Sequence, residues 1–136
     1  MSRGSNAEVV RAIFAAWNRD DMEAVLEHLD PEAELVPLRA QLEGTSYRGH
    51  DGVRQLHSDL NAEWERMQLT VDELREVGAD RVVARSTLTA RGRASGVELE
   101  IPIGWLIELR DGKVIRSQSF SNPDGAFRAA GLEDSG

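Results

Sequence analysis

Few residues in this chain could carry acid–base chemistry. His57 stands between two leucines of an apolar stripe with helical spacing, and Asn61 follows one turn later. Because a histidine side chain titrates near neutral pH, His57 is the best candidate for a general acid or base. The competing interpretation is a histidine that is only hydrogen-bonded at the edge of the core.

Arg85 lies in a segment that alternates like a β-strand. An arginine cannot be buried alone, because desolvation of its charge is costly unless a partner compensates. If Arg85 faces the interior, it needs an internal carboxylate or a ligand with a carbonyl or carboxylate group. The alternative is that Arg85 faces solvent or pairs with Glu73 or Glu100.

Metal and nucleophile chemistry find little support in the sequence. The chain has no cysteine, which excludes disulfides, thiolate nucleophiles and cysteine metal sites. The three histidines, at positions 28, 50 and 57, lack the i, i+4 spacing of a helical zinc site. There is no Gly-x-Ser-x-Gly elbow and no glycine-rich phosphate loop. We therefore expect neither a metal ion nor a cofactor.

The charge of the chain argues against several partners. Its 24 acidic and 16 basic residues give a formal net charge of −8, whereas a nucleic-acid backbone needs a clustered positive face. No apolar stretch approaches the roughly 20 residues of a membrane span, and the N-terminus has no signal-peptide pattern. We expect a cytoplasmic protein that binds neither nucleic acid nor membranes.

Three helices are predicted in the first half of the chain. Ser5 and Glu8 have the spacing of a capping box, and apolar residues then recur at helical intervals over 6–18. Asp20 or Asp21 can cap a second helix, because their carboxylates accept hydrogen bonds from the free amides of its first turn.

The next segments are predicted to be a strand, a loop and a helix. A short strand is expected at 33–38, and an extended piece at 45–48 within a glycine-rich loop. A third helix over about 51–66 would carry Trp64 on its apolar face.

The second half of the chain changes to a period of two, which is typical of strands. The Asp-Gly pair at 111–112 is a strong hairpin signal, since glycine tolerates positive φ. The four predicted strands cover 69–77, 81–91, 97–110 and 113–121.

Helices followed by an antiparallel meander predict an α+β fold, which we take as a single domain over residues 1–136. The apolar face of the meander needs a cover, and the three N-terminal helices can supply it. A curved sheet wrapped around helices makes a cone with an open mouth, which suits a small-molecule pocket. Trp17, at the end of the first helix, is expected to roof that pocket.

The order of these elements resembles the SnoaL-like proteins of the nuclear-transport-factor-2-like superfamily, which includes ketosteroid isomerase. The segments that carry the resemblance are VVRAIFAAWNRDDMEAVLEHLDPEAEL, GTSYRGHDGVRQL, GADRVVARSTLTARGR and IELRDGKVIRSQSFSNPDGAFRAAGL. Together they imply a cone-shaped α+β barrel of the cystatin-like kind, with a curved, mostly antiparallel sheet around three helices. The resemblance does not imply one activity, because this fold hosts enzymes, binding domains and scaffolds.

The resemblance argues against two activities of the superfamily. The positions that ketosteroid isomerase fills with a tyrosine and two aspartates hold residues that cannot transfer a proton: Ile13, Pro37 and Gly104. Both carboxylates of the Asp-Arg-Asp set of limonene-type epoxide hydrolases are missing, since the nearest positions are Arg85, Thr87 and Ser119.

The likeness to the isomerase also implies which strand faces are turned to the pocket. The residues implied to face it are Val83, Arg85, Thr87, Thr89, Ile115, Ser117, Ser119 and Ser121. The other face of the sheet would then be apolar and exposed, and such patches mark association. We therefore expect a homodimer through Ile101, Ile103, Trp105 and Phe120.

Three hypotheses for function follow. In the first, the pocket binds a mostly apolar molecule with a carbonyl or carboxylate, and His57 turns it over as a general base in an isomerase-, cyclase- or hydrolase-like reaction. In the second, the pocket binds such a ligand without catalysis. In the third, the chain is a protein-interaction module that uses only its outer sheet face. The candidate ligand-binding residues are Trp17, Tyr47, His57, Asn61, Arg85, Thr87, Ser117 and Ser119.

Overall fold

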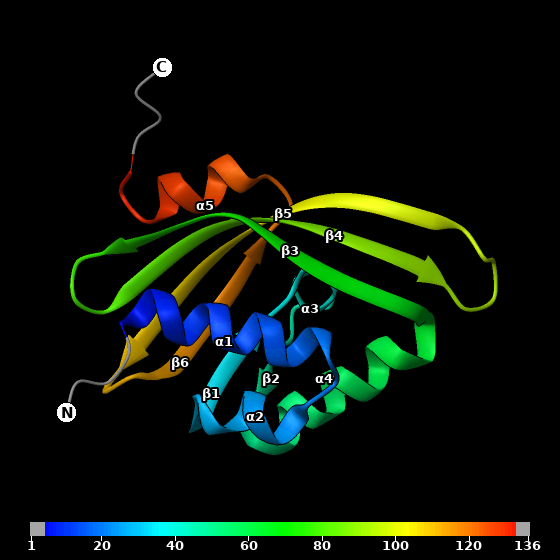
Figure 1. The fold of residues 1–136 in the computed structure, drawn as a ribbon, viewed down its shortest axis with the longest axis horizontal. Coiled ribbons are helices and arrows are strands. Elements are labelled where there is room, and N and C mark those ends of the chain that lie inside the picture. The colour runs from blue at the N-terminus through cyan, green and yellow to red at the C-terminus, as the bar shows by residue number, and fades with distance from the viewer. Residues whose placement is uncertain (1–4, 133–136) are drawn as a thin grey trace.

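The computed structural model describes residues 5–132, which form an α+β fold with helices on both faces of a curved, open sheet (Figure 1). The predicted fold class is therefore confirmed. In chain order the elements are α1 (Asn6–Asn18), α2 (Met22–Glu27), β1 (Leu29–Val36), α3 (Leu38–Glu43), β2 (Tyr47–Arg48), α4 (Gly49–Glu63), β3 (Trp64–Val77), β4 (Arg81–Gly92), β5 (Glu98–Arg110), β6 (Lys113–Phe120) and α5 (Pro123–Ala129).

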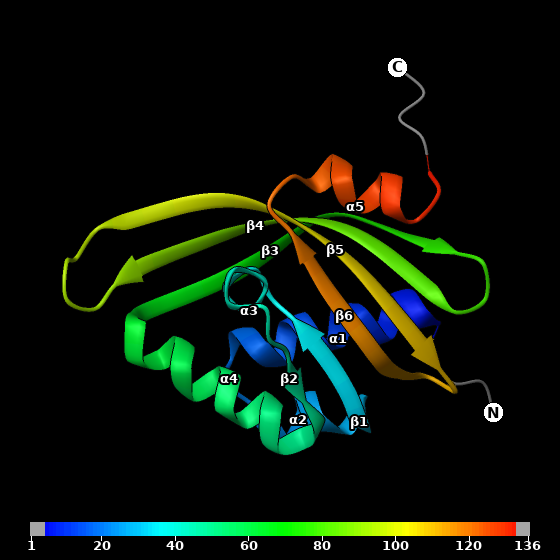
Figure 2. The ribbon, with the colours of Figure 1, turned by 180° about the vertical axis from the view of Figure 1, so that it is seen from behind.

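The strands form one sheet in the order β2-β1-β6-β5-β4-β3. Neighbouring strands are antiparallel except β1 and β6, which run parallel and lie side by side in Figure 2. Helices α1, α2 and α4 lie on one side of the sheet and α5 lies on the other (Figures 1 and 2). The inner face of the sheet is thus covered by α1, α2 and α4, and part of the outer face is covered by α5.

The helix signals in the first part of the sequence are confirmed. Ser5 and Glu8 form both hydrogen bonds of the capping box at the start of α1. The Asp21 side chain accepts a hydrogen bond from the backbone N–H of Ala24, so Asp21 is the residue that caps α2. None of the helices within residues 5–132 is both long and apolar enough to cross a membrane.

Some boundaries differ from the predicted ones. The predicted strand at 33–38 is β1, which already starts at Leu29. The short helix α3 was not predicted, and its C-cap is Gly44, whose φ of 70° suits a glycine. Trp64 was expected on the third helix, but α4 ends at Glu63 and Trp64 is the first residue of β3. Its side chain therefore belongs to the sheet.

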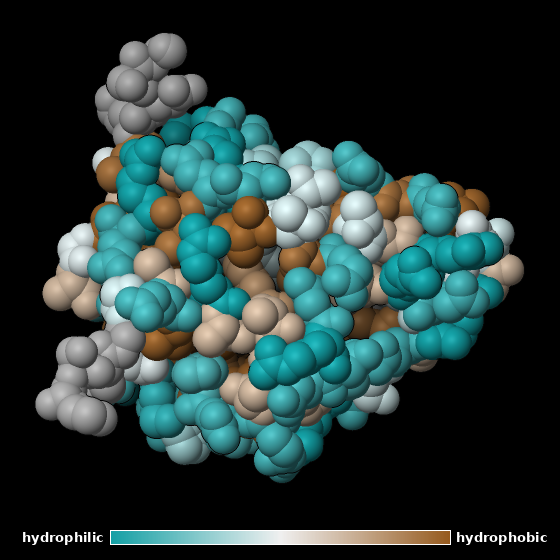
Figure 3. Space-filling view, viewed as in Figure 1, coloured by the Kyte–Doolittle hydropathy of each residue, from teal (hydrophilic) through white to brown (hydrophobic). Residues whose placement is uncertain are grey.

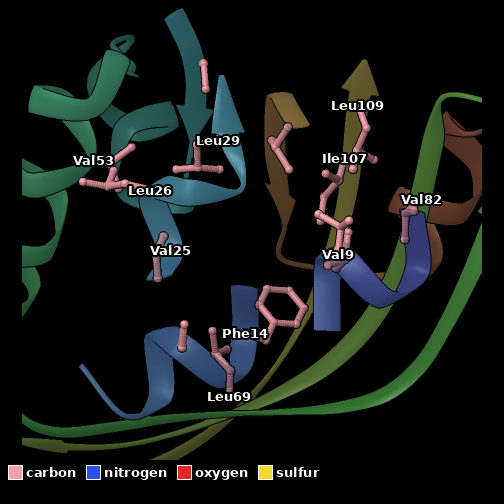
Figure 4. Packing of buried hydrophobic residues seen from close by; sticks show 14 residues of the cluster. Val9, Phe14, Val25, Leu26, Leu29, Val53, Leu69, Val82, Ile107 and Leu109 are labelled. Atoms are coloured by element: carbon pink, nitrogen blue, oxygen red, sulfur yellow. The ribbon is translucent and has the colours of Figure 1, made fainter. Parts of the chain in front are cut away.

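The main core lies between the inner face of the sheet and the helices that cover it. Figure 4 shows buried side chains converging from both layers, among them Phe14 of α1, Val25 of α2, Leu69 of β3 and Ile107 of β5. In the space-filling view the surface over α2 and α4 is mostly hydrophilic, as expected if the apolar stripes of these helices are turned inward (Figure 3).

A second, smaller cluster lies on the outer face of the sheet under α5. Val83 of β4 packs there against Ala126 and Phe127 of α5. The helix approaches β5 closely at Gly104, where a Cβ atom would lie 2.7 Å from the Cα of Pro123. Any larger residue at position 104 would therefore push α5 away from the sheet.

Glu34 joins three strands at the edge of the sheet. Its carboxylate lies 3.5 Å from Arg48 of β2 and 3.4 Å from Arg116 of β6. A hydrogen bond from the Ser46 side chain is the main cause that lowers the pKa of Glu34 below 4.5, and the two arginines act in the same direction. The charged form of Glu34 is therefore favoured in the folded protein.

We expect Glu34→Gln to lower the free energy of unfolding by about 0.5–1 kcal/mol at neutral pH. Because the folded-state pKa is depressed, the contribution of Glu34 is complete above its unfolded value and is lost as the pH falls through the lower, folded value. The difference between wild type and variant should therefore shrink in acid. Urea unfolding across this pH range measures it, with the exposed Glu32→Gln on the same strand as control. A difference that stays constant down to about pH 3 would contradict the assignment.

Candidate functional site

A cavity of about 300 Å³ lies between the inner face of the sheet and the helices α1, α2 and α4. Every lining residue except Glu63, Ser117 and Ser119 has an apolar side chain. The residues that line it are Val10, Ile13, Phe14, Trp17, Val25, Leu29, Leu35, Val36, Pro37, Leu38, Val53, Leu56, Leu60, Glu63, Trp64, Met67, Leu69, Leu88, Ile103, Trp105, Ile107, Val114, Ser117 and Ser119.

Trp105 of β5 is a fixed part of the sheet wall. Its indole Nε1 donates a hydrogen bond of 2.8 Å to the hydroxyl of Ser86 on β4, and that hydroxyl donates to the carbonyl oxygen of Ile103 at 3.1 Å. The Trp105 ring also contacts Phe14 of α1, with 5.2 Å between the ring centroids. Hydrogen bonds and ring packing together hold the indole in one orientation.

Trp17 lines the cavity from the end of α1, as expected from the sequence. The next residue, Asn18, fixes this helix end to the sheet. Its side-chain amide donates to the carbonyl oxygen of Leu69 and accepts from the Leu69 N–H, both at 2.8 Å. Trp17 is thus positioned by a pair of hydrogen bonds between α1 and β3.

His57 and Asn61 lie on α4 next to Trp17, but neither lines the cavity. The His57 ring meets the Trp17 ring edge-on, with centroids 5.4 Å apart, and its Nε2 lies 3.1 Å from the carboxylate of Asp20. Asn61 Nδ2 lies 3.4 Å from the His57 ring nitrogens. The structure therefore brings Trp17, His57 and Asn61 together, while only Trp17 borders the cavity.

The predicted facing of Arg85 and Thr87 is wrong. Arg85 lies over the Phe127 ring at 4.4 Å and makes hydrogen bonds to Asp124 of α5 and Glu73 of β3, on the outer face. Asp124, followed by Glu73, raises the pKa of the Arg85 guanidinium, so it stays charged. The Thr87 hydroxyl donates to Asp72 at 2.7 Å and does not line the cavity.

The alternation of β4 explains why Arg85 points away from the cavity. Val82, Ala84, Ser86 and Leu88 are apolar or small, and the structure turns this set toward the main core and the cavity. Arg85, between them, necessarily points to the opposite face. The resemblance to the isomerase implied the other facing, whereas the alternation within the strand indicated the correct one.

Ser117 and Ser119 of β6 face the cavity, as predicted. Val114 on the same strand also lines it, although strict alternation from Ser117 would turn it outward. The pairing of β5 with β6 shifts register between Glu108 and Leu109, and this bulge returns Val114 to the inner face.

Tyr47 does not reach the cavity either. Its hydroxyl donates a hydrogen bond of 2.8 Å to the carboxylate of Asp59 on α4. This bond ties β2 to α4, so the structure gives Tyr47 a structural contact rather than a place in the cavity wall.

The surface predicted for a homodimer is also corrected. Ile103 and Trp105 line the cavity, and Ile101 shares their face of β5. Phe120 packs against the small cluster under α5. The four residues do not form one exposed outer face, because β5 has the opposite facing and α5 covers part of the sheet; the dimer itself stays a prediction.

The positions that correspond to the ketosteroid isomerase groups are only partly in the cavity. Ile13 and Pro37 line it, but Gly104 faces α5 and its neighbour Ile103 takes the place in the wall. Within residues 5–132, no group of three or more acidic, histidine or cysteine side chains could hold a metal ion. The arrangement offers shape and apolar surface rather than a set of proton-transferring groups.

Sequence reasoning missed several lining residues on α3 and β3. Leu38 belongs to the unpredicted helix α3, Trp64 was predicted on the third helix, and Met67 lies between that predicted helix and the predicted strand at 69–77. Their apolar character indicated that they are buried. Whether the residues of β3 line the cavity, however, depends on where α4 ends and the strand begins.

Comparison with known proteins identifies relatives of this fold. The family model of the SnoaL-like domain matches residues 10–117, whereas no curated protein matches the chain. A nuclear-transport-factor-2-like protein of unknown function from Burkholderia pseudomallei K96243 is 21% identical, with a TM-score of 0.78 over 93% of this chain and 97% of that chain.

Two further solved structures are similar over nearly the same extent. TerC, co-crystallised with polyporic acid, is 25% identical, with a TM-score of 0.77 over 92% of this chain and 96% of that chain. A putative SnoaL-like polyketide cyclase from Jannaschia sp. CCS1 is 21% identical, with a TM-score of 0.73 over 88% of this chain and 90% of that chain. The fold of the chain is therefore the one these proteins share.

We expect Asn18→Ala to lower the free energy of unfolding by about 1–3 kcal/mol, because it leaves the half-buried N–H and C=O of Leu69 without their partner. It should also shift the fluorescence of Trp17. Asn6→Ala, at the other end of α1, removes a single exposed hydrogen bond to Ala79 and is the matched control. Equal, small effects of the two substitutions in urea unfolding would contradict the role given to Asn18.

Proposed function

The chain belongs to the SnoaL-like family, and we propose that it binds a small, uncharged and mostly apolar organic molecule in the cavity beneath its sheet. The observation that carries the proposal is the cavity itself, with a volume of about 300 Å³ and an almost wholly apolar lining. Cavities of roughly 300–1,000 Å³ with few polar groups are typical of small-molecule sites.

The charges around the cavity favour an uncharged ligand. None of the cavity-lining residues within 5–132 carries a positive charge, and Glu63, at the end of α4, is negative. Arg85, the residue expected to hold an acidic group, is engaged by Asp124 and Glu73 on the other face of the sheet. A buried carboxylate or phosphate would therefore lack a counter-charge, which is a large cost.

The relatives support a ligand-binding role. TerC, at 25% identity, was co-crystallised with the small organic molecule polyporic acid, and the family includes putative polyketide cyclases. We extend to this chain only the binding of a small organic molecule in the same kind of fold. Its own cavity determines which chemistry that molecule has.

We propose that the chain binds its ligand without turning it over through His57. The His57 ring contacts Trp17 and Asp20 and is not part of the cavity wall. A general base must come within hydrogen-bond reach of the proton that it removes. In this arrangement His57 supports the Trp17 ring, and none of the cavity-lining residues within 5–132 is a histidine.

The uncharged fluorophore N-phenyl-1-naphthylamine tests the proposal, because its emission rises in apolar surroundings. We expect saturable binding, and we expect Leu60→Trp to weaken it at least about tenfold, since a larger side chain on this half-buried lining residue fills the cavity. Ser58→Trp places the same side chain on the exposed face of α4 and should leave binding unchanged. Binding that survives Leu60→Trp in a folded protein would place the probe elsewhere.

The sulfonated analogue 8-anilino-1-naphthalenesulfonate has the same ring system with a negative charge. We expect it to bind at least about tenfold more weakly than the uncharged fluorophore, because the cavity offers no cation to a buried sulfonate. Fluorescence titration of both probes under the same conditions measures the ratio. Equal affinities, both reduced by Leu60→Trp, would show that the cavity accepts anions and would contradict the uncharged ligand class.

A further inference from the structure

Two buried serines of the sheet differ in how their hydroxyl groups are used. Ser86 is 1% exposed, and its hydroxyl accepts a hydrogen bond from Trp105 and donates one to Ile103. Ser119 is 3% exposed and lines the cavity. Among the residues that the structure describes, its hydroxyl makes no hydrogen bond to the protein, while its backbone oxygen accepts one from the Gln41 side chain at 2.7 Å.

We infer that Ser119 is the polar anchor of the cavity and donates a hydrogen bond to an uncharged carbonyl oxygen of the ligand, with Ser117 as a second donor on the same strand face. This inference rests on the proposed function and names the chemical group that the cavity recognises. Buried hydroxyl groups nearly always have a hydrogen-bond partner in the protein or in ordered water, and a ligand that displaces such water loses affinity unless it replaces that hydrogen bond.

The backbone around Ser119 explains why the ligand should bring an acceptor. Ser119 pairs with Trp105 across the sheet, and its own carbonyl oxygen is held by Gln41 of α3. The indole N–H of Trp105 is already bound to Ser86. These backbone and indole groups thus have partners, whereas the Ser119 hydroxyl proton has none within residues 5–132.

The spacing of the two serines fits one end of a ligand. Residues i and i+2 of a strand lie on the same face with Cα atoms about 6.5–7 Å apart. The ladder between β5 and β6 is regular at this point, because Ser117 pairs with Ile107 and Ser119 with Trp105. Two neutral donors at this separation can hold a carbonyl oxygen or the two oxygens of a larger conjugated system, but they cannot neutralise a carboxylate.

The experiment compares 1-tetralone with tetralin, which has the same bicyclic skeleton without the carbonyl. Both are titrated as competitors of N-phenyl-1-naphthylamine against wild type, Ser119→Ala and Ser117→Ala. We expect Ser119→Ala to weaken 1-tetralone about fivefold to tenfold and to leave tetralin unchanged, since one neutral hydrogen bond is lost. A smaller loss, again limited to 1-tetralone, is expected for Ser117→Ala.

Thr87→Val is the matched control, because it removes a hydroxyl from the outer face of the sheet, where the Thr87 side chain bonds Asp72. It should change neither competitor. The thermal midpoint of Ser119→Ala should equal or exceed that of wild type, because the hydroxyl has no partner in the protein to lose. A lower midpoint would indicate an internal bond and overturn the inference.

The possible failures are distinguishable. If tetralin and 1-tetralone both compete but Ser119→Ala weakens them equally or not at all, the serine anchor is wrong and the apolar cavity stands. If neither competitor nor the fluorophore binds wild-type protein, the proposed function fails and the anchor fails with it. Selective loss of 1-tetralone in Ser119→Ala, with Thr87→Val unchanged, supports the inference.

Discussion

The position of the cavity depends on the paired hydrogen bonds between the Asn18 side chain and the backbone of Leu69. β3 is the last strand of the sheet, so one side of its backbone has no neighbouring strand. The Asn18 amide supplies a donor and an acceptor, as a neighbouring strand residue would. This junction holds the end of α1 against the sheet, directs the chain into α2 and fixes where Trp17 meets the cavity.

Features that depend on neighbours in the sequence could be predicted. The Ser5–Glu8 capping box, the Asp21 cap and the hairpin at Asp111–Gly112 all follow from short-range hydrogen bonds or backbone conformation. The helix α3 and the change from α4 to β3 at Trp64 could not be predicted in the same way. Both depend on tertiary contacts, because an apolar residue at a helix end suits a helix or a strand equally well.

A cavity between the helices and the sheet could be predicted from the sequence, but only some of the side chains that line it could. Trp17, Ser117 and Ser119 border the cavity, whereas Arg85 and Thr87 lie on the other face of β4. Strand residues alternate strictly, so an error of one position turns every side chain to the wrong side. The bulge on β6 is a further obstacle, since nothing in the local sequence marks it. What results is a mostly apolar wall without a positive charge, whose polar side chains are Ser117, Ser119 and Glu63, so that it selects by shape and by hydrogen bonding.

Because α5 covers the outer face over the first part of β4, this part of the strand is enclosed from both sides, and Val82, Val83 and Ala84 are fully buried. Backbone amides in such a strand exchange with solvent only when much of the molecule opens. The two walls of the cavity therefore differ in how readily they fluctuate. The strands form the stiffer wall, whereas α3 and the end of α4 on the helical side carry exposed residues.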